Sequence, residues 1–269
     1  MTNKNILIWI IGLFLLAGCE EEFDWPLSNG ADDLLVVEAV ITNENKNHLI
    51  KLTKPYTTQN QVPNPASGAF VVIFTETDTI LTAENPAGSG LYYTDSMNAV
   101  VDKLYVLGII YNGKQYHAYD FQEPGAPFDN PLSYRQVSEG AYTINFQESG
   151  GNPNYIKYNL DWQNVGNCVN NIDCQAKQIY YDLKNIDINE QFKPDQEKVY
   201  FPPGTVIIRK KYSVSHRYRE YLRGMLSETA WRGGLFDAFP ANAASNLSDG
   251  AVGFFAISTL VMDTTIIVE

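Results

Sequence analysis

The strongest constraint on the fold of this chain is a tight-turn signal, Asn112-Gly113, that stands between two stretches of β-forming residues. These stretches are residues 103–111 and 115–121. A two-residue hairpin turn needs positive φ at both central positions, and Asn and Gly adopt it most readily. The segment is therefore expected to form a β-hairpin, and the chain is expected to be mainly β.

The residues before this hairpin contain further short stretches that are rich in β-branched or alternating residues, which is typical of strands. They are residues 34–42, 48–53, 70–75, 79–83 and 91–94. Together with the hairpin they make seven short strands in about ninety residues, the pattern of a β-sandwich. The sequence predicts an immunoglobulin-like β-sandwich over residues 34–124.

The remainder, residues 125–269, is expected to form a second β-rich domain. Its clearest strand is 155–162, where apolar and polar residues alternate with period two, as in a half-buried strand. Ile156, Tyr158, Leu160 and Trp162 share one face, and Lys157, Asn159 and Asp161 the other. Further strands are predicted at 142–146, 177–183, 204–214, 252–258 and 264–268.

One amphipathic helix is predicted near residues 215–231. Ser215 is a suitable N-cap, and an apolar stripe follows at helical spacing. The stripe consists of Val214, Tyr218, Tyr221, Leu222, Met225 and Thr229. We expect it to pack against a sheet, and the alternative is an aromatic platform for a ligand.

The first eighteen residues are typical of a signal peptide. Lys4 precedes the apolar stretch 6–16, and small residues follow it. Because a bilayer-spanning helix needs roughly 20 apolar residues, this stretch is too short to span a membrane. The alternative is a short anchor that is not cleaved.

The exit sequence Leu16-Ala17-Gly18-Cys19 resembles the bacterial lipobox. The resemblance implies cleavage before Cys19, lipid on its sulfur, and a lipidated tether over residues 19–33. Glu20, Glu21 and Glu22 resemble a surface-export signal of lipoproteins in the Bacteroidota, although a solvated charge run is the alternative. The expected location is the outer membrane, lipid-anchored and facing the cell exterior.

The charge balance argues against nucleic acid as a partner. Without residues 1–18 the chain keeps 18 of 19 basic and all 31 acidic residues, so its formal charge is 18 minus 31, or −13. Neutralising phosphates requires clustered Lys and Arg, which a polyanion of this kind lacks.

Two cysteines remain besides Cys19. Cys168 and Cys174 stand in the short polar segment NCVNNIDC, and an oxidising compartment would let them form a disulfide. The alternatives are two free thiols or a metal site, but no His stands nearby and zinc sites usually have four ligands.

No catalytic constellation stands out, and we expect no enzyme activity, cofactor or metal. His48, His117 and His216 are far apart in sequence, and no Ser has the surroundings of a nucleophile elbow. The pattern Asp187-x-Asn189-x-Gln191 begins like a calcium loop but lacks the Gly and the distal Glu. A hydrolase with a carboxylate pair stays open, because surface acids are abundant.

Several segments together resemble one known family. The opening strand LVVEAVIT, at residues 35–42, comes soon after Cys19. A spaced pattern of tyrosines and glycines follows, made of Tyr105, Gly108, Gly113 and Tyr116. Tyr218 and Tyr221 then precede Phe236. The segment FPANAASNLSDGAVGFFAIS at 239–258, with Pro240, Asn246 and Gly253-Phe254-Phe255, resembles the closing motif. The family is that of Bacteroidota outer-membrane lipoproteins carrying domain of unknown function four-two-four-nine.

The resemblance covers nearly the whole mature chain, although residues 129–203 match only in length and strand pattern. It implies an outer-membrane lipoprotein whose relatives often accompany TonB-dependent receptors, and it carries over no catalytic residues. We therefore expect a non-catalytic accessory or interaction partner of such a receptor barrel. The alternative is a glycan- or peptide-binding surface module that uses its many Tyr and Trp residues as stacking platforms, Trp25, Trp162 and Trp231 among them.

Overall fold

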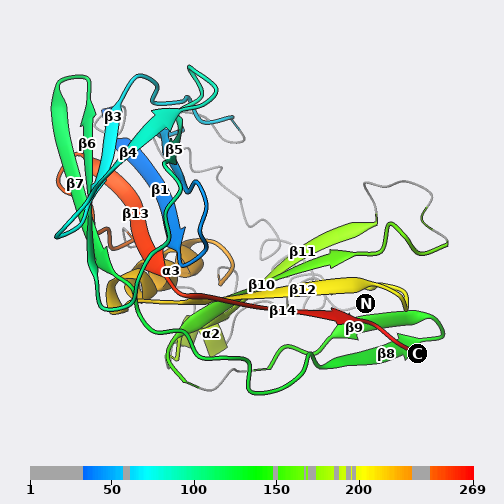
Figure 1. The fold of residues 1–269 in the computed structure, drawn as a ribbon. Helices are drawn as coiled ribbons and strands as arrows, with labels where there is room; N and C mark the ends of the chain where they lie inside the picture. Colours follow the sequence, from blue (N-terminus) through cyan, green and yellow to red (C-terminus); the bar gives the residue numbers. More distant parts are fainter. Residues whose placement is uncertain are drawn as a thin grey trace, which may run out of the picture. The chain divides into compact units, whose positions relative to one another are not determined.

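The computed structural model describes residues 33–56, 61–147, 151–166, 168, 174–184, 188–191, 195, 198–231 and 243–269 (Figure 1). The signal peptide (1–18), Cys19, the acidic run 20–22 and the rest of the tether to residue 32 lie outside these described residues, as do Trp25, Asp187, Phe236 and Pro240. The chain divides into Met1–Ala31 and Asp32–Glu269, and all the described residues belong to the second of these units.

The protein is mainly β, and its first sheet has eight strands in the order β13-β1-β2-β5-β4-β3-β6-β7. The strands are β1 (Leu35–Thr42), β2 (Leu49–Thr53), β3 (Phe70–Phe74), β4 (Thr79–Glu84), β5 (Leu91–Thr94), β6 (Leu104–Tyr111), β7 (Lys114–Phe121) and β13 (Ala251–Ser258). All seven strands predicted for residues 34–124 form. The β6–β7 hairpin turns at Asn112 and Gly113, with φ of 49° and 75°.

The sheet folds over to give two layers around one core. β4 causes this, because residues 79–81 pair with β3 in one layer and residues 82–84 pair with β5 in the other. The enclosed side chains come from both layers and include Val37, Ile50, Ile73, Leu107 and Phe255. This arrangement is that of a β-sandwich.

β13 completes this sheet from the far end of the chain. It pairs in parallel with β1 over its full length, from Leu35 with Ala251 to Thr42 with Ser258. The strand therefore crosses the boundary that the sequence predicts at residue 125. Local periodicity identifies a strand but not its partner, and therefore could not have shown this pairing.

Side chains join β13 to β7 where the two layers meet. The Asn246 amide donates to the carbonyl oxygens of Tyr119 (3.0 Å) and Phe255 (2.8 Å), and its oxygen accepts from Phe255 N (3.1 Å). Asp120 is buried and accepts from Ile257 N at 2.9 Å. These contacts use backbone groups that a continuous ladder would otherwise pair.

Asp120 is expected to make the stability of the fold depend on pH. Burial raises the pKa of its carboxyl from 3.8 to about 6, so folding favours the protonated form. The stabilisation is complete below about pH 4 and is lost as the pH rises through about 6, a change of about 2 to 3 kcal/mol. Denaturant unfolding at pH 4.5 and 7.5 should show this decline in the wild type and lose it in Asp120→Asn.

The exposed Asp95 supplies a control, because Asp95→Asn should leave the pH dependence unchanged. Other carboxylates contribute equally in wild type and variant, so the difference between the two curves reports on Asp120 alone. An identical slope in wild type and Asp120→Asn would contradict the prediction.

The second sheet has four antiparallel strands in the order β11-β10-β12-β14. They are β10 (Asn154–Asp161), β11 (Gln175–Asp182), β12 (Val206–Ser213) and β14 (Leu260–Ile266). A hairpin of β8 (Tyr134–Ser138) and β9 (Ala141–Ile144) packs on one face, over a core that contains Tyr158 and Ile207.

The second sheet differs in part from the prediction. β8 was not predicted, and β14 begins at Leu260, earlier than the predicted residue 264. A four-residue helix, α2 (Ile188–Gln191), was also not predicted.

The predicted helix forms as α3 (His216–Glu228), and the Ser215 hydroxyl caps it by accepting from Tyr218 N at 3.2 Å. Tyr218, Leu222 and Leu226 are buried, and the Tyr218 ring stacks 4.9 Å from that of Phe254 on β13. The stripe therefore packs into the core and is not a ligand platform. Among the described residues, no helix is long and apolar enough to cross a membrane.

Candidate functional site

The second sheet presents a face that no described helix or strand covers along most of its length. Strand register places four residues side by side in each row across this face. The rows are Gln175–Asp161–Val206–Ile266, Lys177–Asn159–Ile208–Thr264, Ile179–Lys157–Lys210–Met262 and Tyr181–Tyr155–Tyr212–Leu260. The last row joins the core under α3. We call the first three rows the open face.

The apolar side chains of the open face are unusually exposed for a sheet. Ile179 and Ile208 keep 36% of their surface, Met262 keeps 51% and Ile266 keeps 60%. Ile208, Met262 and Ile266 lie on the neighbouring strands β12 and β14, whereas Ile179 lies on β11, across β10 from them. Contiguous exposed apolar surface is typical of interaction sites.

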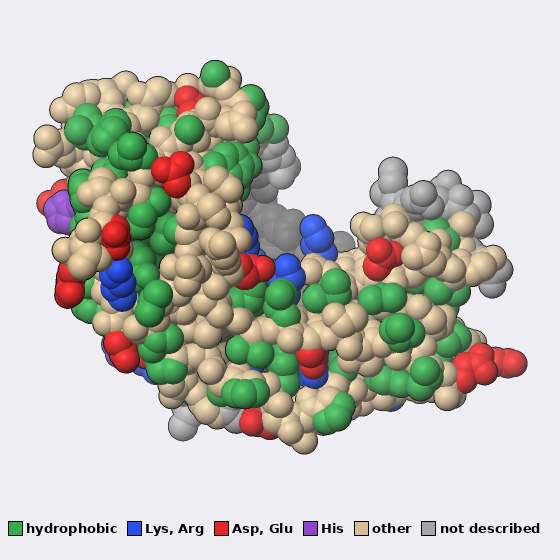
Figure 2. Space-filling model, viewed as in Figure 1, with side chains coloured by type: hydrophobic (Ala, Val, Ile, Leu, Met, Phe, Trp, Pro, Cys, Tyr) green, Lys and Arg blue, Asp and Glu red, His purple; other side chains and the backbone are tan. Residues whose placement is uncertain are grey.

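Three lysines lie among these apolar side chains. The Lys157 ammonium lies 5.2 Å from the centroid of the Tyr212 ring, close enough for a cation–π contact. Burial lowers the pKa of Lys157, and the nearby positive charges of Lys210 and Lys177 lower it further. The three ammonium groups therefore form one cationic cluster, in a chain whose net charge is −12. In Figure 2, Lys and Arg side chains lie beside hydrophobic ones along the upper border of this sheet.

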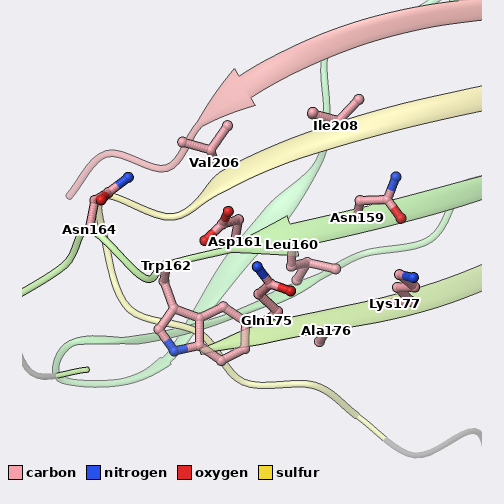
Figure 3. Close-up of a pocket in the computed structure, with 11 residues that line it drawn as sticks. Asn159, Leu160, Asp161, Trp162, Asn164, Gln175, Ala176, Lys177, Val206 and Ile208 are labelled. Atoms are coloured by element: carbon pink, nitrogen blue, oxygen red, sulfur yellow. The ribbon is translucent and has the colours of Figure 1, made fainter. Parts of the chain in front are cut away.

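A shallow pocket of about 580 Å³ lies at the end of the open face nearest the β10–β11 tip (Figure 3). Its lining combines amides and carboxylate with aliphatic groups: Asn159, Leu160, Asp161, Trp162, Asn164, Gln175, Ala176, Lys177, Gly204, Val206 and Ile208. The volume lies within the range of about 300–1,000 Å³ that is usual for ligand sites.

The two described tryptophans, Trp162 and Trp231, do not form an exposed stacking row. Trp162 directly follows the end of β10 at Asp161 and projects to the opposite side in Figure 3, where it packs against the core beneath the sheet. Trp231 is buried, with 3% of its surface exposed. Trp162 is thus the single described tryptophan in the pocket wall, and the aromatic-platform version of the glycan hypothesis has little support in the described residues.

The predicted disulfide forms between Cys168 and Cys174, whose Cα atoms are 5.9 Å apart. It closes the connection between β10 and β11, next to the pocket. The sequence signal was sufficient in this case, because both cysteines lie in one short loop between two predicted strands.

The three histidines stay apart. His48 is buried, and its Nε2 lies 3.2 Å from Glu44 O and 3.1 Å from Met97 O. His117 is on β7 and His216 begins α3. Among the described residues, no group of three or more His, Cys, Asp or Glu is placed to hold a metal ion.

Part of the open face could be predicted from the sequence, and the rest could not. The period-two pattern put Lys157, Asn159 and Asp161 on one side of β10. It could not add Lys177 and Lys210, because their neighbours on the face depend on the register of three strands. The only available signal was that each of the three predicted strands 155–162, 177–183 and 204–214 contains a lysine.

Comparison with known proteins assigns the chain to a family. No curated protein matches the chain. The model of one family, described as Domain of unknown function (DUF4249), matches residues 20–263, which is most of the chain and includes both sheets except the end of β14. The chain therefore belongs to the family defined by Domain of unknown function (DUF4249).

Proposed function

We propose that this protein is a lipid-anchored, non-catalytic accessory protein of the outer membrane that faces the cell exterior and binds a TonB-dependent receptor. The signal peptide, the lipobox resemblance at Cys19 and the acidic run that follows support the location. The observation that carries the binding role is the open face, where exposed aliphatic side chains surround three lysines.

The chemistry of the open face favours one kind of partner. Its aliphatic side chains gain free energy when a partner removes them from water, by about 25 cal/mol per Å². Lys157, Lys177 and Lys210 favour a partner segment that carries carboxylates beside its own aliphatic side chains. We therefore propose that an acidic, partly apolar segment of the receptor occupies the open face.

The path of β1 supports presentation of this face away from the start of the described chain. Asp33, at that start, pairs with Lys114 at the β6–β7 turn. Asn43, just after β1, accepts from Leu260 N at 2.7 Å, at the start of β14. β1 thus leads from Asp33 towards the second sheet, and its eight residues span roughly 26 Å.

Reversing the three charges of the open face should strongly weaken receptor binding. The triple variant Lys157→Glu, Lys177→Glu and Lys210→Glu replaces attraction with repulsion towards an acidic segment, and we expect recovery of the barrel to fall at least about tenfold. The measurement is affinity purification from detergent-solubilised outer membranes, followed by mass spectrometry. Recovery from the wild type should also fall as salt is raised, because exposed charges are screened.

A matched control changes the same number of charges elsewhere. Lys51, Lys54 and Lys103 belong to the first sheet or its loops, and their reversal to Glu should leave recovery of the barrel intact. Absence of any barrel from the wild-type eluate would refute the receptor proposal. Equal recovery by both triple variants would refute the open face as the binding surface.

Small-ligand binding is a second candidate function, and the pocket of Figure 3 favours it. Asn159, Asn164 and Gln175 supply amide groups around the pocket, which suit hydroxyl-rich ligands such as glycans. Binding to a glycan array that is lost in a double variant, Asn159→Ala with Gln175→Ala, would support it. Since neither substitution changes the charge, receptor recovery in that variant separates the two functions.

A further inference from the structure

A second, smaller cavity lies on the other side of the four-stranded sheet from the open face. Its volume is about 180 Å³, and it lies where the linker after β7, the loop before β10 and the end of β12 meet. Its lining consists of Pro124, Gly125, Ala126, Gly151, Asn152, Pro153, Asn154, Lys211 and Ser213. Because side chains alternate along β12, Lys211 points away from the face that carries Lys210.

Lys211 is a buried cation without a carboxylate partner in the described part of the chain. Only 3% of its surface is exposed. Its ammonium donates one hydrogen bond, to Pro127 O at 2.6 Å, and lies 4.7 Å from the centroid of the Phe128 ring. An ammonium has three donors, so two stay available.

Arg209 lies two residues earlier on the same face and is a buried cation that does have a carboxylate partner. Its guanidinium is paired with the Asp263 carboxylate, with Nε donating to Oδ1 at 2.7 Å, and it also donates to Asn130 O. A buried charge is costly unless it is paired and hydrogen-bonded. Lys211 carries that cost without the pairing that Arg209 has.

The cavity that Lys211 lines contains polar groups but no acid among its described lining residues. Asn154 and Ser213 are buried polar residues in its wall. Asp129, Asp182 and Asp263 are near enough to favour the charged form of Lys211, and Arg209 opposes it, but none of these four lines the cavity. Burial is the largest influence on Lys211 and lowers its pKa.

We propose that this cavity binds a carboxylate group, and that the Lys211 ammonium is its counter-charge. The carboxylate would form the direct ion pair that Lys211 lacks with the described acids, and it would accept from the two available donors. The volume admits a small carboxylic acid or the carboxyl terminus of a peptide, which have this chemistry in common. This carboxylate site is independent of the proposed receptor partnership.

The first test is a titration of the lipid-free mature chain by NMR or calorimetry, with three probes. They are acetate, a short peptide with a free carboxyl terminus, and the same peptide as its terminal amide. We expect the first two to bind competitively and the amide to bind at least about tenfold more weakly. Binding of acetate alone would identify a small free acid as the ligand, and peptide preference would identify a chain terminus. No saturable binding of either carboxylate would overturn the proposal.

The second test replaces Lys211 by Met, which keeps the length of the side chain and removes the charge. Lys211→Met should lose at least about tenfold in carboxylate affinity, and Lys210→Met on the opposite face should lose none. Without ligand, Lys211→Met should melt at the same or a higher temperature, since an unpaired buried charge has been removed. Unchanged carboxylate binding in Lys211→Met would overturn the assignment.

If Lys211→Met does not fold, chemical protection gives the answer on the wild type. Saturating acetate or peptide should slow reductive methylation of Lys211 selectively, as read by mass spectrometry, and leave Lys210 unaffected. Equal rates at Lys211 with and without carboxylate would refute the site.

Discussion

Replacing Cys19 by Ala should release the protein from membranes completely. Burial of acyl chains contributes about 0.8 kcal/mol per CH₂, and two or more chains give stable anchoring where one does not. The lipid on Cys19 is the attachment that the proposed location requires, so its loss should leave the protein in the aqueous phase. The measurement is partitioning between detergent and aqueous phases, together with the intact mass of the purified native protein.

A double variant, Cys168→Ala with Cys174→Ala, is the matched control for the thiols. It removes the disulfide but keeps Cys19, so it should partition like the wild type. An unmodified Cys19 sulfur in the native protein, or full membrane partitioning of Cys19→Ala, would contradict the proposed anchoring. The proposed location and receptor partnership would then lose their basis.

A second large effect is expected from Gly253→Ala, in the middle of β13. Gly253 has a φ of +102°, and a Cβ there would lie 2.1 Å from the carbonyl oxygen of Val37 on β1. Val37 is buried and its strand is paired on both sides, so its backbone atoms cannot move aside as the end of a side chain can. Unfavourable φ and overpacking together should cost about 2 to 5 kcal/mol. Equilibrium denaturation in urea measures this loss.

Gly88→Ala separates the two contributions. Gly88 has a φ of +85°, but a Cβ there would meet nothing within 4 Å. Its substitution should therefore show the cost of the backbone conformation alone, about 1 to 2 kcal/mol. Equal losses at positions 88 and 253 would mean that contact with Val37 contributes nothing.

Local features of the fold could be predicted from the sequence because their causes are local. Alternation in 155–162 identified β10, Asn112-Gly113 identified the β6–β7 turn, and Ser215 identified the start of α3. β8 was missed because residues 134–138 are mostly exposed and lack an apolar face. The partner of β13 could not be predicted, since parallel pairing between distant segments leaves no periodic signal.

The candidate sites, like the fold, have some features that the sequence could predict and others that it could not. Cys168 and Cys174 could be paired from sequence because six positions separate them. The open face needed the register of β10, β11, β12 and β14, which side-chain patterns alone do not determine. Lys211 could not be distinguished from Lys210 until the structure showed which of the two is buried.

The parallel pair of β1 and β13 has a consequence for biogenesis. In the proposed export, the chain crosses the inner membrane from its amino terminus, so β1 would reach the periplasm long before residues 251–258. Until then, one edge of β1 has unpaired amide and carbonyl groups beside apolar side chains, a state that invites aggregation. Chaperones that shield strand edges should therefore associate with the nascent protein, and premature termination before β13 should leave a product that is degraded.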